Sequence, residues 1–318
     1  MTDYNPNNYF DKFITGNQKP KLGIAISTYS EANTDSKRYE IIQRSFDSLL
    51  NAISHYYEEL YIFIVVDGPV PEIHDKIIED FVEKCEYEYS RNQKQKQKQE
   101  QEKNQKTNFT NNFKNNFKTI FHINVVKRIE NGGVAKTKNT CIRLLLENNV
   151  DVGFLADDDL LYGEDCFSKY LEFIIKSRCH HLIACYPHPQ VHPNWEQMGY
   201  VLTINNGQVV RKHSGGVGYF LSITPKLIEK VGYFRILPGK FGFEHFNFTK
   251  RAIYHKMIPF PFDIDESVKY VEHIGFWPIA ENLYGKCHSI TNQTKDQEVD
   301  KNKRVWKNNL WYCDPLIE

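Results

Sequence analysis

The chain has 318 residues, of which 41% are hydrophobic, so it is long enough and apolar enough to form a core, and disorder of the whole chain is excluded. Its 40 Lys and Arg residues balance 40 Asp and Glu residues, so the overall charge gives no argument for a nucleic-acid or membrane partner. Seven cysteines, an odd number without a C-x-x-C pair, indicate reduced buried thiols rather than a disulfide framework or a zinc site.

The N-terminus, MTDYNPNNYFDKF, has neither the basic segment nor the apolar core of a secretory signal. The longest apolar run, YIFIVV, is too short to cross a bilayer. We therefore expect a soluble, cytoplasmic protein without an integral membrane segment.

Apolar runs of strand length alternate with segments of helical periodicity through the first half of the chain. In chain order we expect a strand at 22–28, a helix at 36–57, a strand at 61–68, a helix at 72–88, a strand at 121–128, a helix at 134–148, a strand at 152–159 and a helix at 164–177. The strands are continuous rather than alternating apolar runs, which is typical of a parallel sheet covered by helices on both faces.

Residues 90–118 form a low-complexity tract with few apolar residues, which we interpret as a solvated insertion between a helix and the next strand. Eight basic and two acidic residues give the tract a net charge of +6, which leaves −6 on the rest of the chain. An acidic body is expected to recruit divalent cations rather than polyanions. Phe109, Phe113, Phe117 and Phe121 recur every four residues, which predicts a short helix docked on the body; a partner-binding segment is the alternative.

The second half of the chain has a mixed α+β pattern. YVLTINNGQVVRK, residues 200–212, alternates around an Asn-Gly turn and predicts a hairpin. A glycine-rich loop, a strand and a helix follow, and Thr224-Pro225 is a favourable N-cap and first-turn pair for that helix. We expect one continuous domain with two lobes.

Polar side chains follow several of the predicted strands, at the point where each strand ends. They are residues 28–31, Asp67-Gly68, residues 128–133 and residues 157–159. The carboxyl ends of parallel strands meet at one edge of a sheet, and ligands bind there because the connecting loops converge. The sequence therefore predicts a single candidate site at that edge.

Three adjacent carboxylates, Asp157, Asp158 and Asp159, end the fourth predicted strand. Their mutual repulsion would be relieved by a divalent cation, and Mg²⁺ or Mn²⁺ prefers carboxylate oxygens together with substrate phosphates. Such a metal, bound to a diphosphate, suits sugar-nucleotide chemistry because it neutralises the departing diphosphate. The alternative is an N-cap for the helix near 164, for which one Asp suffices.

With these motifs in this order, the chain resembles the GT-A fold glycosyltransferases, and is most similar to family 2, over about residues 21 to 275 without the insertion. The resemblance implies a single domain with a mostly parallel, Rossmann-like α/β sheet, a nucleotide-binding half at about 21–160, an acceptor half at about 180–275 and a C-terminal extension at 276–318. It implies metal-dependent transfer of a sugar from a nucleotide donor, a UDP-sugar, to an acceptor hydroxyl of a glycan, protein or small molecule, with inversion.

The resemblance assigns donor-binding roles to residues at the strand ends. In ISTYSEA, Thr28, Tyr29 and Glu31 would contact the base and ribose, and Asp67 of IVVDGP would receive the uracil imide N–H. RIENGGVAKTKNTCI resembles the family's N-x-G-x-x-x-x-R-N-x-G segment. Residues implied there are Gly132 and Gly133 beside the diphosphate, Lys136 reaching a phosphate or the uracil carbonyl, and Asn139; Gly215 and Gly216 would line the donor sugar.

The metal element has two possible registers. Aligned with L-D-x-D-D, it uses Asp158 and Asp159, and read as D-x-D it uses Asp157 and Asp159, so Asp159 serves in both. His273, after the apolar VKYV, falls where metal-dependent members often place a histidine ligand; His213 and His288 are alternatives.

The catalytic element departs from the family pattern. Glu244-His245 stands where the family has Glu-Asp, and that Asp commonly acts as the base on the acceptor hydroxyl. Either Glu244 or His245 would then be the base, since imidazole has a suitable pKa. A capping Glu and a packed His, with no catalytic role, are the alternative.

Two rival functions remain at this point. A sugar-nucleotide pyrophosphorylase needs a glycine-rich signature after its first strand, and STYSEANTDSKR has no glycine. A catalytically inactive, sugar-binding scaffold is compatible with the replacement at His245.

Overall fold

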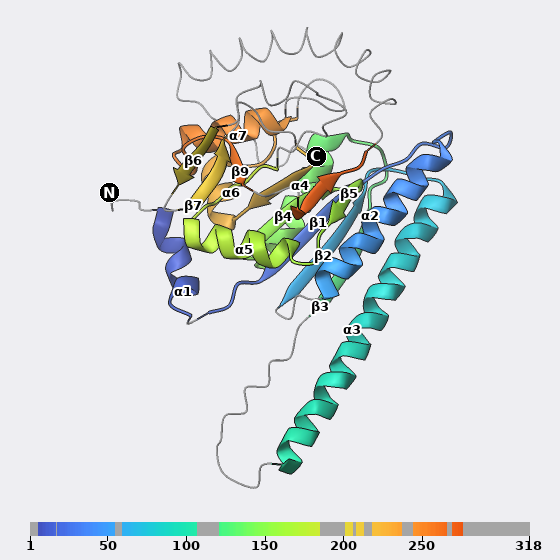
Figure 1. Cartoon of the computed structure of the whole chain (residues 1–318). Helices are drawn as coiled ribbons and strands as arrows, with labels where there is room; N and C mark the ends of the chain where they lie inside the picture. The colour runs from blue at the N-terminus through green and yellow to red at the C-terminus, as the bar shows by residue number, and fades with distance from the viewer. Residues whose placement is uncertain are drawn as a thin grey trace.

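A computed structural model describes residues 6–16, 18–54, 59–106, 121–184, 201–205, 208–212, 218–236, 244–265 and 269–275. Its centre is a five-stranded sheet in the order β3-β2-β1-β4-β8 (Figure 1). The strands are β1 (Leu22–Thr28), β2 (Leu60–Val66), β3 (Phe121–Lys127), β4 (Val152–Asp157) and β8 (Phe220–Ile223). The first four are parallel and β8 is antiparallel to β4, so the predicted mostly parallel α/β sheet is confirmed.

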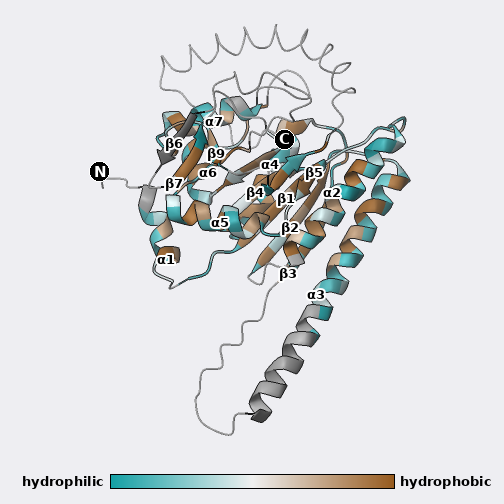
Figure 2. Ribbon diagram, in the orientation of Figure 1, coloured by the Kyte–Doolittle hydropathy of each residue, from teal (hydrophilic) through white to brown (hydrophobic). Residues whose placement is uncertain are grey.

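Helices follow the parallel strands as the sequence predicts. They are α2 (Ser36–Ser54), α3 (Glu72–Lys106), α4 (Val134–Glu147) and α5 (Cys166–Ser177), and a short N-terminal pair, η1 (Pro6–Phe10) and α1 (Asp11–Ile14), precedes β1. Apolar side chains concentrate in the sheet and on the helix surfaces that face it (Figure 2). All seven residues of β2 are buried, which explains the unbroken apolar run YIFIVV.

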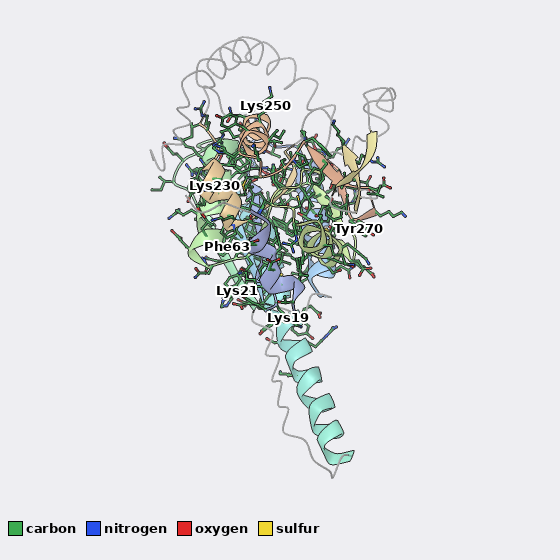
Figure 3. The ribbon with its side chains drawn as sticks, turned by 90° about the vertical axis from the view of Figure 1, so that its left-hand side faces the viewer. Lys19, Lys21, Phe63, Lys230, Lys250 and Tyr270 are labelled. Atoms are coloured by element: carbon green, nitrogen blue, oxygen red, sulfur yellow. The ribbon has the colours of Figure 1, made fainter. Side chains whose placement is uncertain are left out.

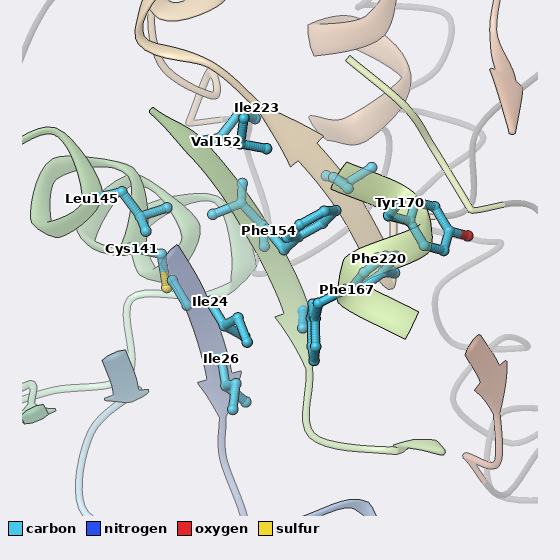
Figure 4. Close-up of a cluster of buried hydrophobic side chains, with 14 of the residues drawn as sticks. Ile24, Ile26, Cys141, Leu145, Val152, Phe154, Phe167, Tyr170, Phe220 and Ile223 are labelled. Atoms are coloured by element: carbon cyan, nitrogen blue, oxygen red, sulfur yellow. The ribbon is translucent and has the colours of Figure 1, made fainter. Parts of the chain in front are cut away.

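The two faces of the sheet are covered by different helices. A Cβ added at Gly23 or Gly153 would lie 2.3 or 2.8 Å from Leu145 of α4, so α4 packs directly on these glycines. Phe154, the next residue of β4, points to the other face because side chains alternate along a strand. There it stacks on Phe220 and meets Tyr170 of α5 edge to face (Figure 4).

The structure bears on two predictions for the tract at 90–118. The helix predicted at 72–88 is longer than expected, because residues 90–106 form the distal part of α3, which extends well beyond the sheet (Figure 1); that the tract is an insertion stays a prediction. These residues continue the helix because they are rich in Gln, Lys and Glu and contain neither Gly nor Pro. Phe121 begins β3 and so is not part of the predicted phenylalanine helix, whose other members lie outside the described residues.

The second half forms two small antiparallel sheets. The predicted hairpin is confirmed as β6 (Val201–Asn205) and β7 (Gln208–Lys212), and β9 (Phe262–Ile264) pairs with β7. The predicted strand at 152–159 ends two residues early, because β4 ends at Asp157; a further short strand, β5 (Leu160–Tyr162), pairs with β10 (Val271–His273).

Two helices of the second half pack on each other. Thr224 caps α6 (Pro225–Val231) by accepting from the Leu227 amide at 3.2 Å, as predicted. The helix α7 (Glu244–Tyr254) begins with the two predicted catalytic residues. Lys230 and Lys250, which belong to these two helices, lie at the end of the body opposite Lys19 and Lys21 (Figure 3). Within the described part of the chain, no helix is long and apolar enough to span a bilayer.

Candidate active site

The register of the sheet brings the predicted residues of the first half to one edge. Ser27 of β1 is opposite Val65 of β2 on one side and Asp157 of β4 on the other. Thr28, Asp67 and the three aspartates therefore lie at neighbouring strand ends. These motifs share one edge because the strands are parallel and in register, although the order of the strands in the sheet, β3-β2-β1-β4, differs from their order in the sequence.

Asp158 belongs to a buried hydrogen-bond chain at this edge. One of its oxygens accepts from the Thr28 hydroxyl and the other pairs with Arg38 of α2. Nε2 of His74 lies 2.8 Å from the Thr28 hydroxyl, and Nδ1 lies 2.6 Å from the Ser30 hydroxyl. Since Thr28 gives its one proton to Asp158, His74 donates through Nε2 and accepts from Ser30.

In this hydrogen-bond network, both oxygens of Asp158 have partners within the protein. Burial lowers the pKa of His74, although the Asp158 charge acts in the opposite direction, so the ring is neutral at physiological pH. The Thr28 hydroxyl is likewise engaged with Asp158 and His74. Its neighbours Tyr29, which is half-buried, and Glu31, which is exposed, continue the loop after β1.

Asp159 faces His273, which comes from β10. Its Oδ1 lies 3.4 Å from Nε2 of His273, and its Oδ2 lies 3.7 Å from Nη1 of Arg38. Oδ1 is buried and has no hydrogen-bond partner among the residues that the structure describes. Burial alone would raise the pKa of Asp159, but the charges of His273 and Arg38 outweigh it and hold that pKa well below its ordinary value.

Gly275 leaves the space in which Asp159 and His273 meet. A Cβ at this position would lie 2.4 Å from Oδ2 of Asp159 and 2.6 Å from Cε1 of His273. Both distances are far below a van der Waals contact, so a side chain here would push the pair apart.

Asp157 is the most exposed of the three aspartates, with 34% of its side chain accessible. Its Oδ1 accepts from the Ser27 hydroxyl at 3.1 Å and faces the ammonium of Lys138 at 2.9 Å. Lys138, in α4, is fully buried and also donates to the Gly218 carbonyl at 2.5 Å. Each aspartate therefore has a positively charged residue of the protein beside it.

Asp67 holds the glycine loop before α4. Its two oxygens accept from the backbone amides of Gly132 and Gly133, each at 2.9 Å, and Nε of Arg128 lies 3.1 Å from Oδ1. Gly133 has φ of 82°, in the region that favours glycine, and is the N-cap of α4. The predicted contact of Asp67 with uracil stays a prediction.

Lys136 and Asn139 lie on α4 behind the glycine loop. Lys136 passes close to Gly132, where an added Cβ would lie 2.9 Å from its Cδ. The amide of Asn139 joins the backbone of Phe234 twice, donating to its carbonyl at 2.9 Å and accepting from its N–H at 2.8 Å. Asn139 thus links α4 to the segment after α6. Gly215 and Gly216 lie outside the described residues, as do His213 and His288.

Glu244 and His245 form a buried pair at the start of α7. Oε1 of Glu244 lies 3.0 Å from Nε2 of His245. Burial alone would raise the pKa of Glu244, but the neighbouring His245 outweighs it and lowers that pKa to about 2. The His245 ring packs edge to face on Phe234, with 5.4 Å between the ring centroids. Its Nδ1 is buried and, within the described part of the chain, has no hydrogen-bond partner.

A role for the basic residues of α2 and α4 that contact the aspartates was not predicted, because these residues carry little signal in the sequence. Arg38 carries no signal beyond its place near the start of an amphipathic helix. Lys138 had one: it directly precedes Asn139, at the position where the quoted family segment has its Arg. His74 was predicted only as part of a helix.

Few side chains at this edge of the sheet are available as ligands for a divalent metal. Among the described residues, no three His, Cys, Asp or Glu side chains form a metal-binding cluster. Asp158 is committed to Thr28 and Arg38, and Asp157 faces Lys138. Asp159 and His273 remain, one oxygen and one nitrogen donor, and they fit an ion whose other ligands are phosphate oxygens and water.

Known proteins that are similar to this chain include a glycosyltransferase. No protein-family model matches the chain. An uncharacterized glycosyltransferase of Acanthamoeba polyphaga mimivirus is 34% identical over 260 residues, covering 81% of this chain and 83% of that protein.

Solved structures of TarS from S. aureus are more distantly similar. One has a TM-score of 0.47 at 14% identity and covers 80% of this chain, which spans only 37% of that chain. A structure of TarS residues 1–349 in complex with UDP-GlcNAc has a TM-score of 0.43 at 14% identity, covering 74% of this chain and 54% of that one. No residue role is transferred from likenesses at this level.

The relative from the mimivirus is similar along most of both chains, and the polar strand ends described above lie within a mostly parallel α/β sheet. On this similarity, the chain belongs to the glycosyltransferases.

Proposed function

We propose that this glycosyltransferase uses a UDP-sugar as donor and a divalent cation, Mn²⁺ or Mg²⁺, and that it transfers the sugar to an acceptor hydroxyl with inversion. The observation that carries the proposal is the edge formed by the ends of β1, β2 and β4. There, buried Oδ1 of Asp159 lies 3.4 Å from Nε2 of His273 and makes no closer contact with a donor among the described residues. A buried carboxylate oxygen held only by this long ion pair is incompletely satisfied, and a cation between Asp159 and His273 would satisfy it.

Asp67 is proposed to read the base. Each carboxylate oxygen can accept more than one hydrogen bond, so the two loop amides leave Asp67 able to accept the uracil imide N–H. The glycine loop that it holds opens α4, whose N-terminus favours negative charge. Base recognition and diphosphate binding are therefore proposed to share one anchored loop.

Asp159 and His273 would hold the metal, which when bound would neutralise charge on the departing diphosphate. Arg38 stands beside both Asp158 and Asp159 and limits the negative charge that the donor meets. Gly275 keeps the Asp159–His273 space open. These side chains orient the leaving group, so the acceptor oxygen can attack in line from the other side.

The Glu244–His245 pair is proposed to take the acceptor proton, through Nδ1 of His245. The ionised Glu244 can only accept, so Nε2 of His245 carries the proton that faces it. Nδ1 then keeps its lone pair, and no described residue donates to it. This is the arrangement of a base held by a carboxylate, and it requires that the incoming acceptor uncover Nδ1.

The test is release of UDP from a panel of UDP-sugars by the wild type and by Asp159→Ala, with Mn²⁺ present. The proposal predicts release by the wild type and at least about a hundredfold less by the variant, since the variant loses an oxygen ligand of the metal. Absence of release from every sugar, in a folded protein that binds UDP, would instead favour the inactive sugar-binding scaffold.

A further inference from the structure

One buried lysine, Lys138, contacts both an aspartate at the end of β4 and the backbone that packs against His245. Lys138 lies in the second turn of α4, and its side chain is fully buried. Its ammonium is 2.9 Å from Oδ1 of Asp157, at the end of β4, and 2.5 Å from the carbonyl of Gly218, just before β8. The His245 ring packs against Gly218, where an added Cβ would lie 1.8 Å from its Cδ2.

A lysine in this position needs a reason beyond packing. Removing an ammonium from water is costly unless a charge and hydrogen-bond acceptors replace the water, and an apolar side chain would fill the same space without that cost. Lys138 meets this requirement through the Asp157 carboxylate and the Gly218 carbonyl. Its charge is therefore matched to Asp157.

Each of the three aspartates lies beside at least one basic side chain. Arg38 pairs with Asp158 and approaches Asp159, and His273 faces Asp159. Lys138 is the partner of Asp157, which forms no other ion pair with the residues that the structure describes. Without Lys138, the most exposed of the three carboxylates would carry an uncompensated charge toward solvent at the edge of the sheet.

We propose that Lys138 is a positioning residue, and this proposal rests on the proposed function. Lys138 neutralises Asp157 and so allows the diphosphate of a nucleotide donor to bind nearby. The same ammonium fixes the Gly218 carbonyl, which keeps the His245 side of the site in place. The role is electrostatic and acts through Asp157, because buried Lys138 does not itself reach a ligand.

The experiment compares UDP with uridine, which has the same base and ribose but no phosphate. Dissociation constants for both are measured by calorimetry on wild type, Lys138→Met and Lys138→Met/Asp157→Asn, with Mn²⁺ present. Lys138→Met should weaken UDP about tenfold or more, because an unpaired carboxylate then repels the diphosphate, and should leave uridine within about twofold. The double variant should recover UDP affinity, because both charges are absent.

Lys176→Met is the matched control for loss of a lysine charge, since the Lys176 side chain is 58% exposed at the end of α5. Its UDP affinity should equal that of the wild type. Equal weakening of UDP and uridine in Lys138→Met, without recovery in the double variant, would show that the lysine is structural and would overturn the proposal. Unchanged UDP affinity in Lys138→Met would also overturn it. A wild type that binds neither ligand would contradict the proposed function itself.

Discussion

Gly218→Ala is expected to separate sugar transfer from donor binding. The added methyl would lie 1.8, 1.9 and 2.0 Å from Cδ2, Cγ and Nε2 of His245. An ordinary carbon contact needs about 3.5 Å, so the ring must withdraw by roughly 1.5 Å. A displacement of about 1 Å at a reacting group can cost about a hundredfold in rate. The carbonyl that accepts from Lys138 belongs to the backbone and is retained.

The assay measures two quantities on the same protein, the rate of UDP release from the best UDP-sugar of a panel and the dissociation constant of UDP. The account predicts a loss of about a hundredfold in release and UDP affinity within about twofold of wild type. Gly16→Ala is the control, because a Cβ there meets nothing within 4 Å and its φ of +72° makes it a test of backbone strain alone. Wild-type release by Gly218→Ala would refute the placement of His245 in the reaction.

Four further predictions concern the metal, the base, the pH dependence of stability and the long helix. Asp159→Ala should keep its fold by circular dichroism but lose the Mn²⁺-dependent part of its UDP affinity in calorimetry, since it removes the carboxylate that faces His273. His245→Asn should reduce UDP release by about 10²–10⁴ and Glu244→Gln by less, because one removes the base and the other only its support; the reverse order would make Glu244 the base. The Glu244 pKa of about 2, lowered from 4.5, means that its carboxylate stabilises the fold above about pH 4.5 and that this contribution is lost as the pH falls towards 2. Thermal unfolding of Glu244→Gln should therefore depend less on pH across that window, and an unchanged dependence would contradict the buried ion pair. Deleting residues 91–107 should leave UDP release within a few-fold, since α3 carries them beyond the sheet; a collapse in soluble yield would show that the tract supports the fold.

The sheet could be predicted from the sequence because its signals are local. Leu22–Thr28 matches the predicted strand residue for residue, since seven apolar or small residues are bounded by polar ones. The candidate site followed from the same strands, because parallel strands in register carry their polar ends to one edge. The short strand β5 could not be predicted, because it depends on pairing with β10, which is far away in the sequence.

The burial of Lys138 and the position of Arg38 could not be predicted from helical periodicity, and the one signal for Lys138 was its place where the family segment has its Arg. In an amphipathic helix, a lysine such as Lys138 is expected to face solvent, and only the packing of α4 beneath β4 and Gly218 makes it a buried partner of Asp157. Arg38 contacts the aspartates from the first turn of α2, which is far from them in the sequence. The extension of α3 beyond the predicted helix at 72–88 was missed for the opposite reason, since a polar tract without an apolar face was interpreted as a solvated insertion.

The most direct test of the account is the stabilisation of the protein by UDP in the presence and absence of a divalent cation. Thermal unfolding is followed at a UDP concentration of 100 times its dissociation constant, with either Mn²⁺ or EDTA. We expect about 2.7 kcal/mol of stabilisation with Mn²⁺ and little with EDTA, because diphosphate and aspartates repel each other without a bridging ion. Equal stabilisation by UDP in EDTA would contradict the metal site at Asp159 and His273, and no stabilisation under either condition would contradict the nucleotide donor.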